Sequence, residues 1–463
     1  MRFPTALTLG ADLLAGRTSS MRLTEQALQR IEDAGGEGAR AFVKVYADTA
    51  MAEARVADVL RASGVRRSPI DGLPVSIKDL FDVAGSVTRA GSIALSDAPP
   101  AQADAPAVAR LRAAGAVIIG RTNTVEFAFG GVGLNPHYGT PLNPYGRNDG
   151  GRGRVPGGSS CGAGVAVADG MCTMGLGSDT RGSVRIPAAL CGIAGFKPTA
   201  ARVPKDGCWP LSYTLDSVGP LCNSIHDCAL YDAILSGATC TSAAAPAPLP
   251  PSSLRLLMPV GTALFDGLDA QVSTAFESGV AKLRAAGATI DESAQGAPDL
   301  VRQTQELFVF GGGGFAGAEA YHVHRELLQK KGHLYDPRVA SRIAAGEQFG
   351  AADYMQLFRE RDARISEAKA LLAPYDAMIY PTVACTAPTV EEVSRSDEDY
   401  VRWNLLMLRN TGLMNALDGC AATVPCQKEG DAPVGLTVAG MGGSDHRVLA
   451  ASQAVEAILQ QSA

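Results

Sequence analysis

Two adjacent serines, Ser159 and Ser160, lie in the glycine-rich stretch VPGGSSCGAG at residues 155–164. A third serine, Ser183, closes the turn of a second stretch rich in small residues, GLGSDTRGSVRIPAALCG at 175–192. A serine hydroxyl becomes a nucleophile when a nearby base removes its proton. Successive backbone N–H groups in the turn before Ser183 can also converge on one point and hold an oxyanion. These residue types therefore indicate acyl transfer at a serine.

A base for such a serine is available in GLPVSIKDLFDV, residues 72–83, where Lys78 ends an apolar run that predicts a strand. Burial lowers the pKa of a lysine and allows its neutral form to accept a proton. A lysine after a strand is also a common solvated charge at a sheet edge. The residues alone leave both interpretations open.

Other chemistries fit the sequence less well. None of the six histidines is in a nucleophile-elbow context, which disfavours a Ser-His-Asp triad. GLGSDTRGS lacks the G-K-[ST] ending of a P-loop and the third glycine of a dinucleotide-binding turn, so a nucleotide-binding module is a weak reading. No C-x-x-C pair is present among the ten cysteines. We therefore expect no metal and no cofactor.

The composition and net charge limit where the protein can be located and what it can bind. The chain has 463 residues, 46% of them hydrophobic, and a formal net charge of -6, which argues against general affinity for nucleic acid or for anionic membrane. The N-terminal stretch does not read as a signal peptide and no apolar run is long enough for a spanning helix. We expect a soluble cytoplasmic protein with reduced, buried thiols. Its expected partner is a small-molecule substrate, and a homodimer is a possible assembly.

Helical and strand patterns alternate along the chain, which predicts an α/β fold with helices on both faces of a sheet. After two short N-terminal helices, a helix capped by Asp104 leads into a strand at 116–120, and the pattern returns at 273–290. Strands are predicted within 254–261, 375–383 and 432–440, a long helical region covers 315–370, and a helix closes the chain from 445.

The motifs resemble those of the amidase signature family over nearly the whole chain. The resemblance is carried by LPVSIKDLFDV, PGGSSCGAG, GSDTRGSVRIPAALCGIAGFKPT, LDSVGPL, YDAMIYPTV and PVGLTVAG. It implies one amidase domain, 1–463, built on a single large mixed sheet covered by helices on both faces. Within it we expect an N-terminal helical region (1–70), a catalytic core (71–236), an Ala/Pro-rich surface connection (237–253), and a second half (254–463) whose variable segment near 300–370 sets specificity.

The resemblance also implies a catalytic relay without histidine. Ser183 would be the nucleophile, Ser159 a bridging serine on a cis peptide bond, and Lys78 the final base. Ser160 would support the relay by hydrogen bonding, and Asp179 and Arg185 would brace the turn. The oxyanion hole would be formed by the backbone N–H groups of four residues, Thr180, Arg181, Gly182 and Ser183.

Two positions depart from the family pattern, which usually has glycine at both. Arg181 fits its turn only if its φ is negative or the backbone accepts strain, and its side chain then faces either the substrate or solvent. Cys161 is expected to fill a packing gap and not to act as a nucleophile.

The family implies hydrolysis of small carboxamides, anilides or carbamates by a free-standing enzyme. The alternative is the glutaminase subunit of a tRNA-dependent amidotransferase, and a catalytically inactive binding relative is a third reading. SVRIPAAL has Ile186 where the tRNA-linked branch typically has glutamine, which favours the first reading. Aromatic residues of the variable segment would line an acyl or aryl pocket or belong to the core: Phe308, Phe310, Phe315 and Tyr321.

Overall fold

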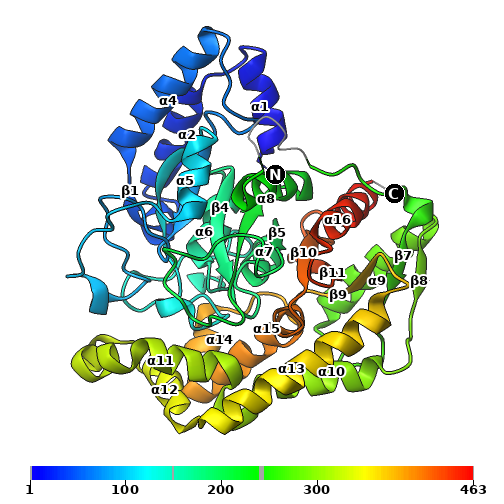
Figure 1. Ribbon diagram of the computed structural model, residues 1–463. Helices are drawn as coiled ribbons and strands as arrows, with labels where there is room; N and C mark the ends of the chain where they lie inside the picture. Colours follow the sequence, from blue (N-terminus) through cyan, green and yellow to red (C-terminus); the bar gives the residue numbers. More distant parts are fainter. Residues whose placement is uncertain (1–2, 149–150, 239–244, 462–463) are drawn as a thin grey trace.

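A single mixed sheet forms the centre of the molecule (Figure 1). The computed structural model describes residues 3–148, 151–238 and 245–461. Its strands are β1 (Phe42–Val45), β2 (Pro74–Lys78), β3 (Val117–Thr122), β4 (Met174–Asp179), β5 (Ala194–Lys197), β6 (Ser217–Cys222), β7 (Arg255–Leu257), β8 (Thr289–Asp291), β9 (Ala377–Pro381), β10 (Cys420–Pro425) and β11 (Gly435–Gly440). They pair in the order β1-β3-β2-β4-β6-β5-β10-β11-β9-β7-β8. The predicted α/β class is confirmed.

Helices surround this sheet along its whole length. Among the described residues they are α1 (Ala6–Leu14), α2 (Ser20–Glu32), α3 (Gly38–Ala41), α4 (Ala47–Ala62), α5 (Pro106–Ala113), α6 (Cys161–Ala168), α7 (Arg185–Cys191), α8 (Ile225–Ser236), α9 (Ala270–Ala285), α10 (Ala297–Glu306), α11 (Gly314–Lys331), α12 (Pro337–Ala344), α13 (Ala351–Leu372), α14 (Val390–Ser394), α15 (Asp397–Ala416) and α16 (Asp445–Leu459).

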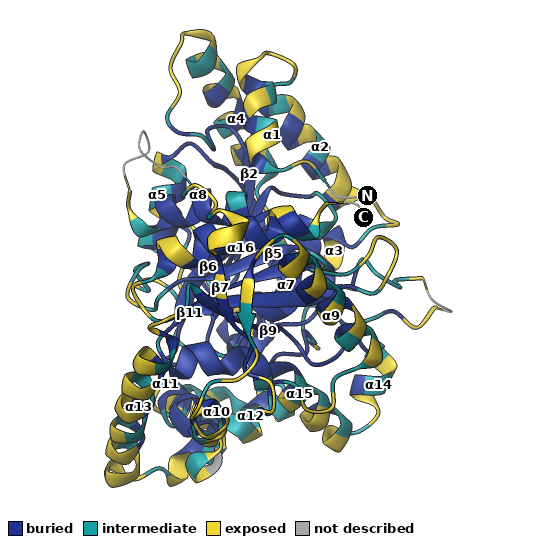
Figure 2. Ribbon diagram, turned by 90° about the vertical axis from the view of Figure 1, so that its right-hand side faces the viewer, coloured by how far each residue is buried: buried dark blue, intermediate teal, exposed yellow. Residues whose placement is uncertain are grey.

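The two faces of the sheet form separate cores because side chains alternate along each strand. In β3, Val117 and Ile119 belong to a core cluster that includes residues of α6 and α7, whereas Ile118 belongs to another cluster that includes residues of α8 and α16. Figure 2 shows the resulting buried centre, with the exposed residues mainly on the outer helices and on the loops. The serine-bearing segments around α6 and α7 therefore lie inside the fold.

The sheet crosses from the first half of the chain to the second where β5 pairs with β10. The Ala/Pro-rich connection at 237–253 is a surface segment over residues 245–253, while 239–244 lie outside the described residues. The variable segment folds into α10 to α13, and α11 to α13 lie at the lower end of the molecule in Figure 1, near α14 and α15.

The N-terminal region contains helices as predicted, and it also contributes β1, which extends the sheet by pairing with β3 in antiparallel fashion. One local prediction was wrong. Asp104 does not cap α5, because its carboxylate accepts from the Ala84 backbone N–H and from Arg112 instead. Pro106 begins that helix, where a missing N–H costs nothing.

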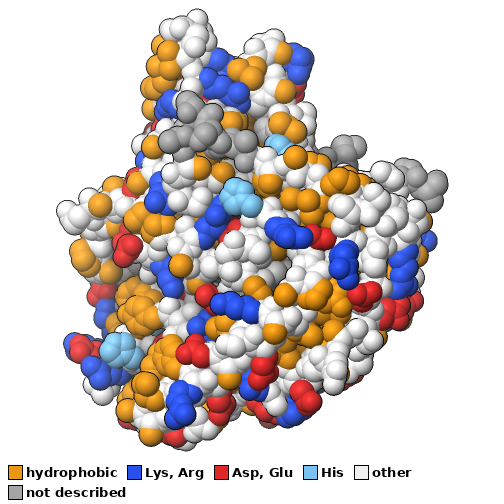
Figure 3. All heavy atoms as spheres, turned by 45° about the vertical axis from the view of Figure 1, so that its right-hand side comes forward, with side chains coloured by type: hydrophobic (Ala, Val, Ile, Leu, Met, Phe, Trp, Pro, Cys, Tyr) orange, Lys and Arg blue, Asp and Glu red, His pale blue; other side chains and the backbone are white. Residues whose placement is uncertain are grey.

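Across residues 3–148, 151–238 and 245–461, no helix has the length and apolar character needed to cross a bilayer. The face drawn in Figure 3 carries basic and acidic side chains interspersed with apolar ones. That face offers no large patch of one charge.

Candidate active site

Lys78, the last residue of β2, is completely buried. Its Nζ donates to Ser159 Oγ at 2.7 Å and to Ser178 Oγ at 2.9 Å. Burial lowers the pKa of Lys78 from 10.5 to about 8, because the charged form loses its hydration. Ser178, which precedes Asp179 on the neighbouring strand β4, was missed by the sequence reading. A base with this pKa is substantially neutral in mildly alkaline solution.

Ser159 is held by the segment that follows β3. Its peptide bond to Gly158 is cis. The Ser159 carbonyl accepts from Thr124 Oγ1 at 3.0 Å and from the Val125 N–H at 3.1 Å. The hydroxyl is thereby directed to Lys78.

The turn that leads to Ser183 is organised around one buried carboxylate. Asp179 accepts from the N–H groups of Gly182 (2.7 Å) and Val184 (3.2 Å) and from Nε and Nη2 of Arg185 (3.0 and 2.9 Å). Asn415 of α15 donates to the same carboxylate at 3.0 Å. Burial alone would raise the pKa of Asp179, but the Arg185 charge and these hydrogen bonds lower it to about 2. Asp179 is therefore an ionised hub that fixes the turn.

One of the four backbone N–H groups predicted for the oxyanion hole, that of Gly182, is engaged elsewhere. The Gly182 N–H already donates to Asp179, which withdraws it from the predicted set. The N–H groups of Thr180, Arg181 and Ser183 have no hydrogen-bond acceptor within the described parts of the chain. Gly182 has a φ of 122°, and a Cβ there would lie 2.1 Å from Thr411 Oγ1, so this turn requires glycine at that position.

The side chains of Ser160 and Cys161 are buried beside the serine relay. The Ser160 hydroxyl, expected to support the relay, is buried without a hydrogen-bond partner in the described structure because it faces Gly177. The Ser160 N–H instead donates to the Ser183 carbonyl at 3.2 Å, which ties the two serine segments together. Cys161 is buried, and burial raises the pKa of its thiol to about 12. A thiol with this pKa carries almost no thiolate at neutral pH.

Ser183 borders a pocket of about 330 Å³, a volume within the usual range for small ligands. Its walls come from the segment 128–130, the turn at Thr180 and Arg181, Phe308 and the helices α12 and α15. Of the four aromatic residues predicted for the pocket, Phe308 lines it.

The other three aromatic residues lie elsewhere. Phe310 packs against the Phe349 ring, Phe315 is buried in the core formed with α13, and Tyr321 donates to Glu347 beside a separate pocket. Phe315 and Tyr321 lie six positions apart on α11, so their side chains point in directions about 120° apart and cannot share one wall.

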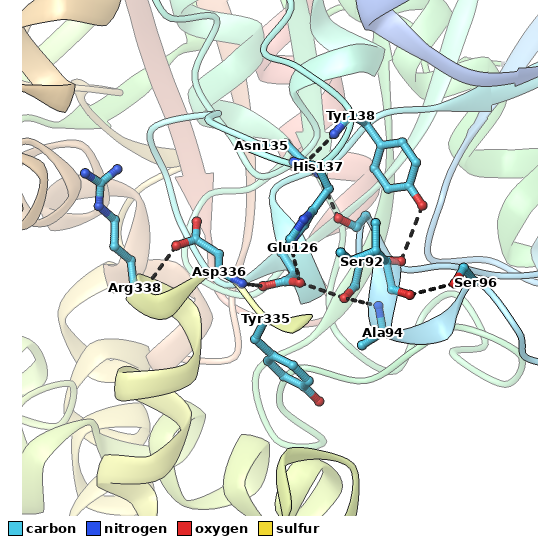
Figure 4. Close-up of polar contacts among 12 residues, drawn as sticks. Ser92, Ala94, Ser96, Glu126, Asn135, His137, Tyr138, Tyr335, Asp336 and Arg338 are labelled. Atoms are coloured by element: carbon cyan, nitrogen blue, oxygen red, sulfur yellow. Dashed lines mark hydrogen bonds and ion pairs between the residues drawn. The ribbon is translucent and has the colours of Figure 1, made fainter. Parts of the chain in front are cut away.

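A buried carboxylate anchors two of the pocket walls (Figure 4). Glu126 accepts from Ser92 Oγ at 2.6 Å and from the Asp336 N–H at 2.7 Å, and its Oε1 lies 2.9 Å from His137 Nε2. Glu126 lies two residues before the wall segment 128–130, and Asp336 is the N-cap of α12, which carries Arg342 into the pocket. The sequence reading assigned Glu126 no role, because these contacts join distant segments.

Asp179→Ala is expected to lower the free energy of unfolding by about 3 to 5 kcal/mol, since it leaves the buried Arg185 charge without its carboxylate. Denaturant unfolding followed by circular dichroism measures this loss. Asp299→Ala, which breaks an exposed pair with Arg302, serves as the control and should leave stability nearly unchanged. Equal stability of the Asp179→Ala variant and the wild-type protein would contradict the hub role.

The sheet and the serine turns define the class of protein. The family model for amidases matches residues 22–449, and the chain belongs to that family. It is similar to 2-amino-5-chloromuconic acid deaminase of Comamonas testosteroni (35% identity, covering 89% of this chain and 87% of the relative) and to 1-carboxybiuret hydrolase subunit AtzE of Pseudomonas sp. (strain ADP) (34%, 82% and 81%). A crystal structure of an amidase superposes with a TM-score of 0.85 at 31% identity, covering 98% of this chain and 99% of that one. The protein is an amidohydrolase that acts on C–N bonds.

Proposed function

We propose that the protein hydrolyses small carboxamides, anilides or carbamates through a relay of Lys78, Ser159 and Ser183. The observation that carries this proposal is the buried Lys78 Nζ, 2.7 Å from Ser159 Oγ, with a lowered pKa and no carboxylate hydrogen-bonded to it in the described structure. A lysine in this state has a pKa suited to general base catalysis near neutral pH.

The proposed reaction begins with proton transfer from Ser159 to neutral Lys78 and from Ser183 to Ser159. Ser183 Oγ then forms a bond to the substrate carbonyl carbon, and the C–N bond breaks as the proton returns through the relay to the leaving nitrogen. Water attacks the resulting ester, releases the acid and restores the Ser183 hydroxyl.

The developing oxyanion needs hydrogen-bond donors that no other group occupies. We assign this role to the backbone N–H groups of Thr180, Arg181 and Ser183, since Gly182 is bound to Asp179. Asp179 and Arg185 would hold these donors in place before substrate arrives.

The similar proteins support hydrolysis at C–N bonds, since one is named a deaminase and another a hydrolase. We place the protein in the cytoplasm, because the nine cysteines within the described residues are free thiols. A homodimer remains the expectation for its assembly, and the glutaminase subunit of a tRNA-dependent amidotransferase is the alternative function.

A substrate panel tests the proposal. The purified chain alone should release ammonia or amine from at least one of the aliphatic amides, aryl amides and carbamates offered. Glutamine should be a poor substrate in the same assay. Release of ammonia from glutamine solely in the presence of partner subunits would favour the alternative.

A further inference from the structure

The pocket beside Ser183 has an unusual balance of charge. Arg181 and Arg342 line it, and no aspartate or glutamate of the described residues does so. The remaining wall is largely apolar, with Phe129, Phe308 and Leu408. A cavity of this kind favours a ligand that carries negative charge on an otherwise small apolar body.

Arg181 is partly buried and lacks the carboxylate partner that the fully buried arginines have. Arg121 and Arg185 each pair with a carboxylate, at 2.7 and 2.9 Å, whereas Arg181 makes no ion pair within the described structure. Its Nε is buried without an acceptor there. Burial lowers the pKa of Arg181 to about 10, which leaves the guanidinium charged at neutral pH. A partly desolvated cation without a carboxylate partner is stabilised by a ligand that supplies one.

The Arg181 side chain is nevertheless fixed in position. Its guanidinium carbon lies 4.0 Å from the centre of the Phe308 ring, and its carbonyl accepts from Thr411 Oγ1 at 2.5 Å. Gly412 leaves space for this stack, since a Cβ there would lie 3.0 Å from Phe308 and 3.3 Å from Arg181 Nε. Arg181 is also absent from the residues with positive φ, so the turn accepts it without strain. Stacking on a ring leaves the in-plane donors of the guanidinium free.

The guanidinium of Arg342, the second arginine of the pocket, already donates hydrogen bonds to acceptors of the protein. Its Nε donates to the Arg338 carbonyl at 2.9 Å, and its Nη2 donates to the Phe129 carbonyl and to Tyr400 Oη. It therefore adds positive charge to the pocket but has fewer donors to offer. Arg181, two positions before Ser183, is the better placed of the two.

We propose that the substrate carries a carboxylate, and that Arg181 binds this group while the amide carbonyl lies at Ser183. The planar guanidinium matches a carboxylate through two parallel hydrogen bonds. The substrate class is then an amide with an acid group a short distance from the scissile bond, such as the monoamide of a short dicarboxylic acid. This inference rests on the proposed hydrolysis at Ser183.

Matched pairs of amides test the inference. Malonamate, succinamate and glutaramate are each compared with the neutral amide in which a methyl group replaces the carboxylate: propanamide, butanamide and pentanamide. The wild-type enzyme should favour the acid of at least one pair by about ten- to hundred-fold in kcat/KM, the range expected for charge-assisted hydrogen bonds. Arg181→Met should remove this preference, so that the ratio of kcat/KM for the acid to kcat/KM for its neutral partner falls to about one. Arg181→Lys, which keeps the charge but loses the fork, should fall between the two.

Arg402→Met provides the control, since Arg402 also stacks on an aromatic ring, that of Trp403, but is exposed and outside the pocket. It should retain the wild-type preference. A preference that survives Arg181→Met, parallel losses for both members of a pair, or no preference in any pair would overturn the inference.

Binding separates this inference from the proposed reaction. In Ser183→Ala protein, calorimetry should show tighter binding of the favoured acid than of its neutral partner, and Arg181→Met should abolish the difference. If wild-type protein hydrolyses no amide but this Arg181-dependent binding is present, the carboxylate site stands and the proposed reaction fails. If hydrolysis occurs without Arg181-dependent binding, the inference fails and the reaction stands.

Discussion

Replacing Ser183 with alanine is expected to lower kcat by about 10⁴- to 10⁶-fold, the effect seen when an acyl-transfer nucleophile is removed. The fold should be unchanged. In the described structure Ser183 forms a hydrogen bond through its backbone carbonyl, which accepts from the Ser160 N–H, and the substitution leaves that carbonyl in place. Steady-state kinetics on a substrate from the panel measure the loss, and thermal unfolding monitors the fold.

Ser160→Ala is the matched control for this experiment. Ser160 lies beside Ser159 in the sequence, but its hydroxyl has no partner in the described structure. The variant should keep most of the activity. A Ser183→Ala enzyme that keeps comparable activity would remove Ser183 from the chemistry.

Lys78→Met is expected to lower kcat/KM by about 10²- to 10⁴-fold, the usual contribution of a general base. In the wild-type enzyme the base must be neutral, and its pKa is lowered to about 8 by burial. The value of kcat/KM should therefore fall about tenfold per pH unit below that pKa and level off above it. The residual activity of the variant should lack this acid limb.

A second buried lysine makes the control for Lys78 necessary. Burial also lowers the pKa of Lys197 to about 8, and its Nζ donates to the Pro198 carbonyl at 2.9 Å and to no serine hydroxyl in the described structure. An acid limb alone would fit either lysine. Lys197→Met should keep the limb, and its disappearance in that variant together with its survival in Lys78→Met would reverse the assignment.

Local patterns in the sequence predicted most of the elements around the site. Lys78 at the end of an apolar run, the small residues of α6 and the turn before Ser183 are encoded within short segments, and the structure places them side by side. The run of consecutive apolar residues in β3 likewise predicts a strand, and the structure buries it on both faces. These features depend on contacts between near neighbours in the chain.

Features that depend on distant contacts were not predictable in the same way. Ser178 reaches Lys78 across a strand pair, and Asn415 reaches Asp179 from a helix more than 200 residues further along the chain. β1 was missed because it becomes a strand by pairing with β3, and its four residues carry little pattern of their own. Periodicity along α11 likewise does not say which of its faces meets the pocket.

Labelling of the wild-type enzyme with a phosphonyl fluoride, followed by peptide mass spectrometry, tests the central claim most directly. Such reagents form a stable adduct with an activated serine, and the relay activates one hydroxyl. We predict a single adduct on Ser183. In the wild-type enzyme it should form faster as the pH rises through about 8, and in Lys78→Met it should form more slowly than in the wild-type enzyme. An adduct on Ser159, Ser178 or any other residue in place of Ser183 would contradict the account.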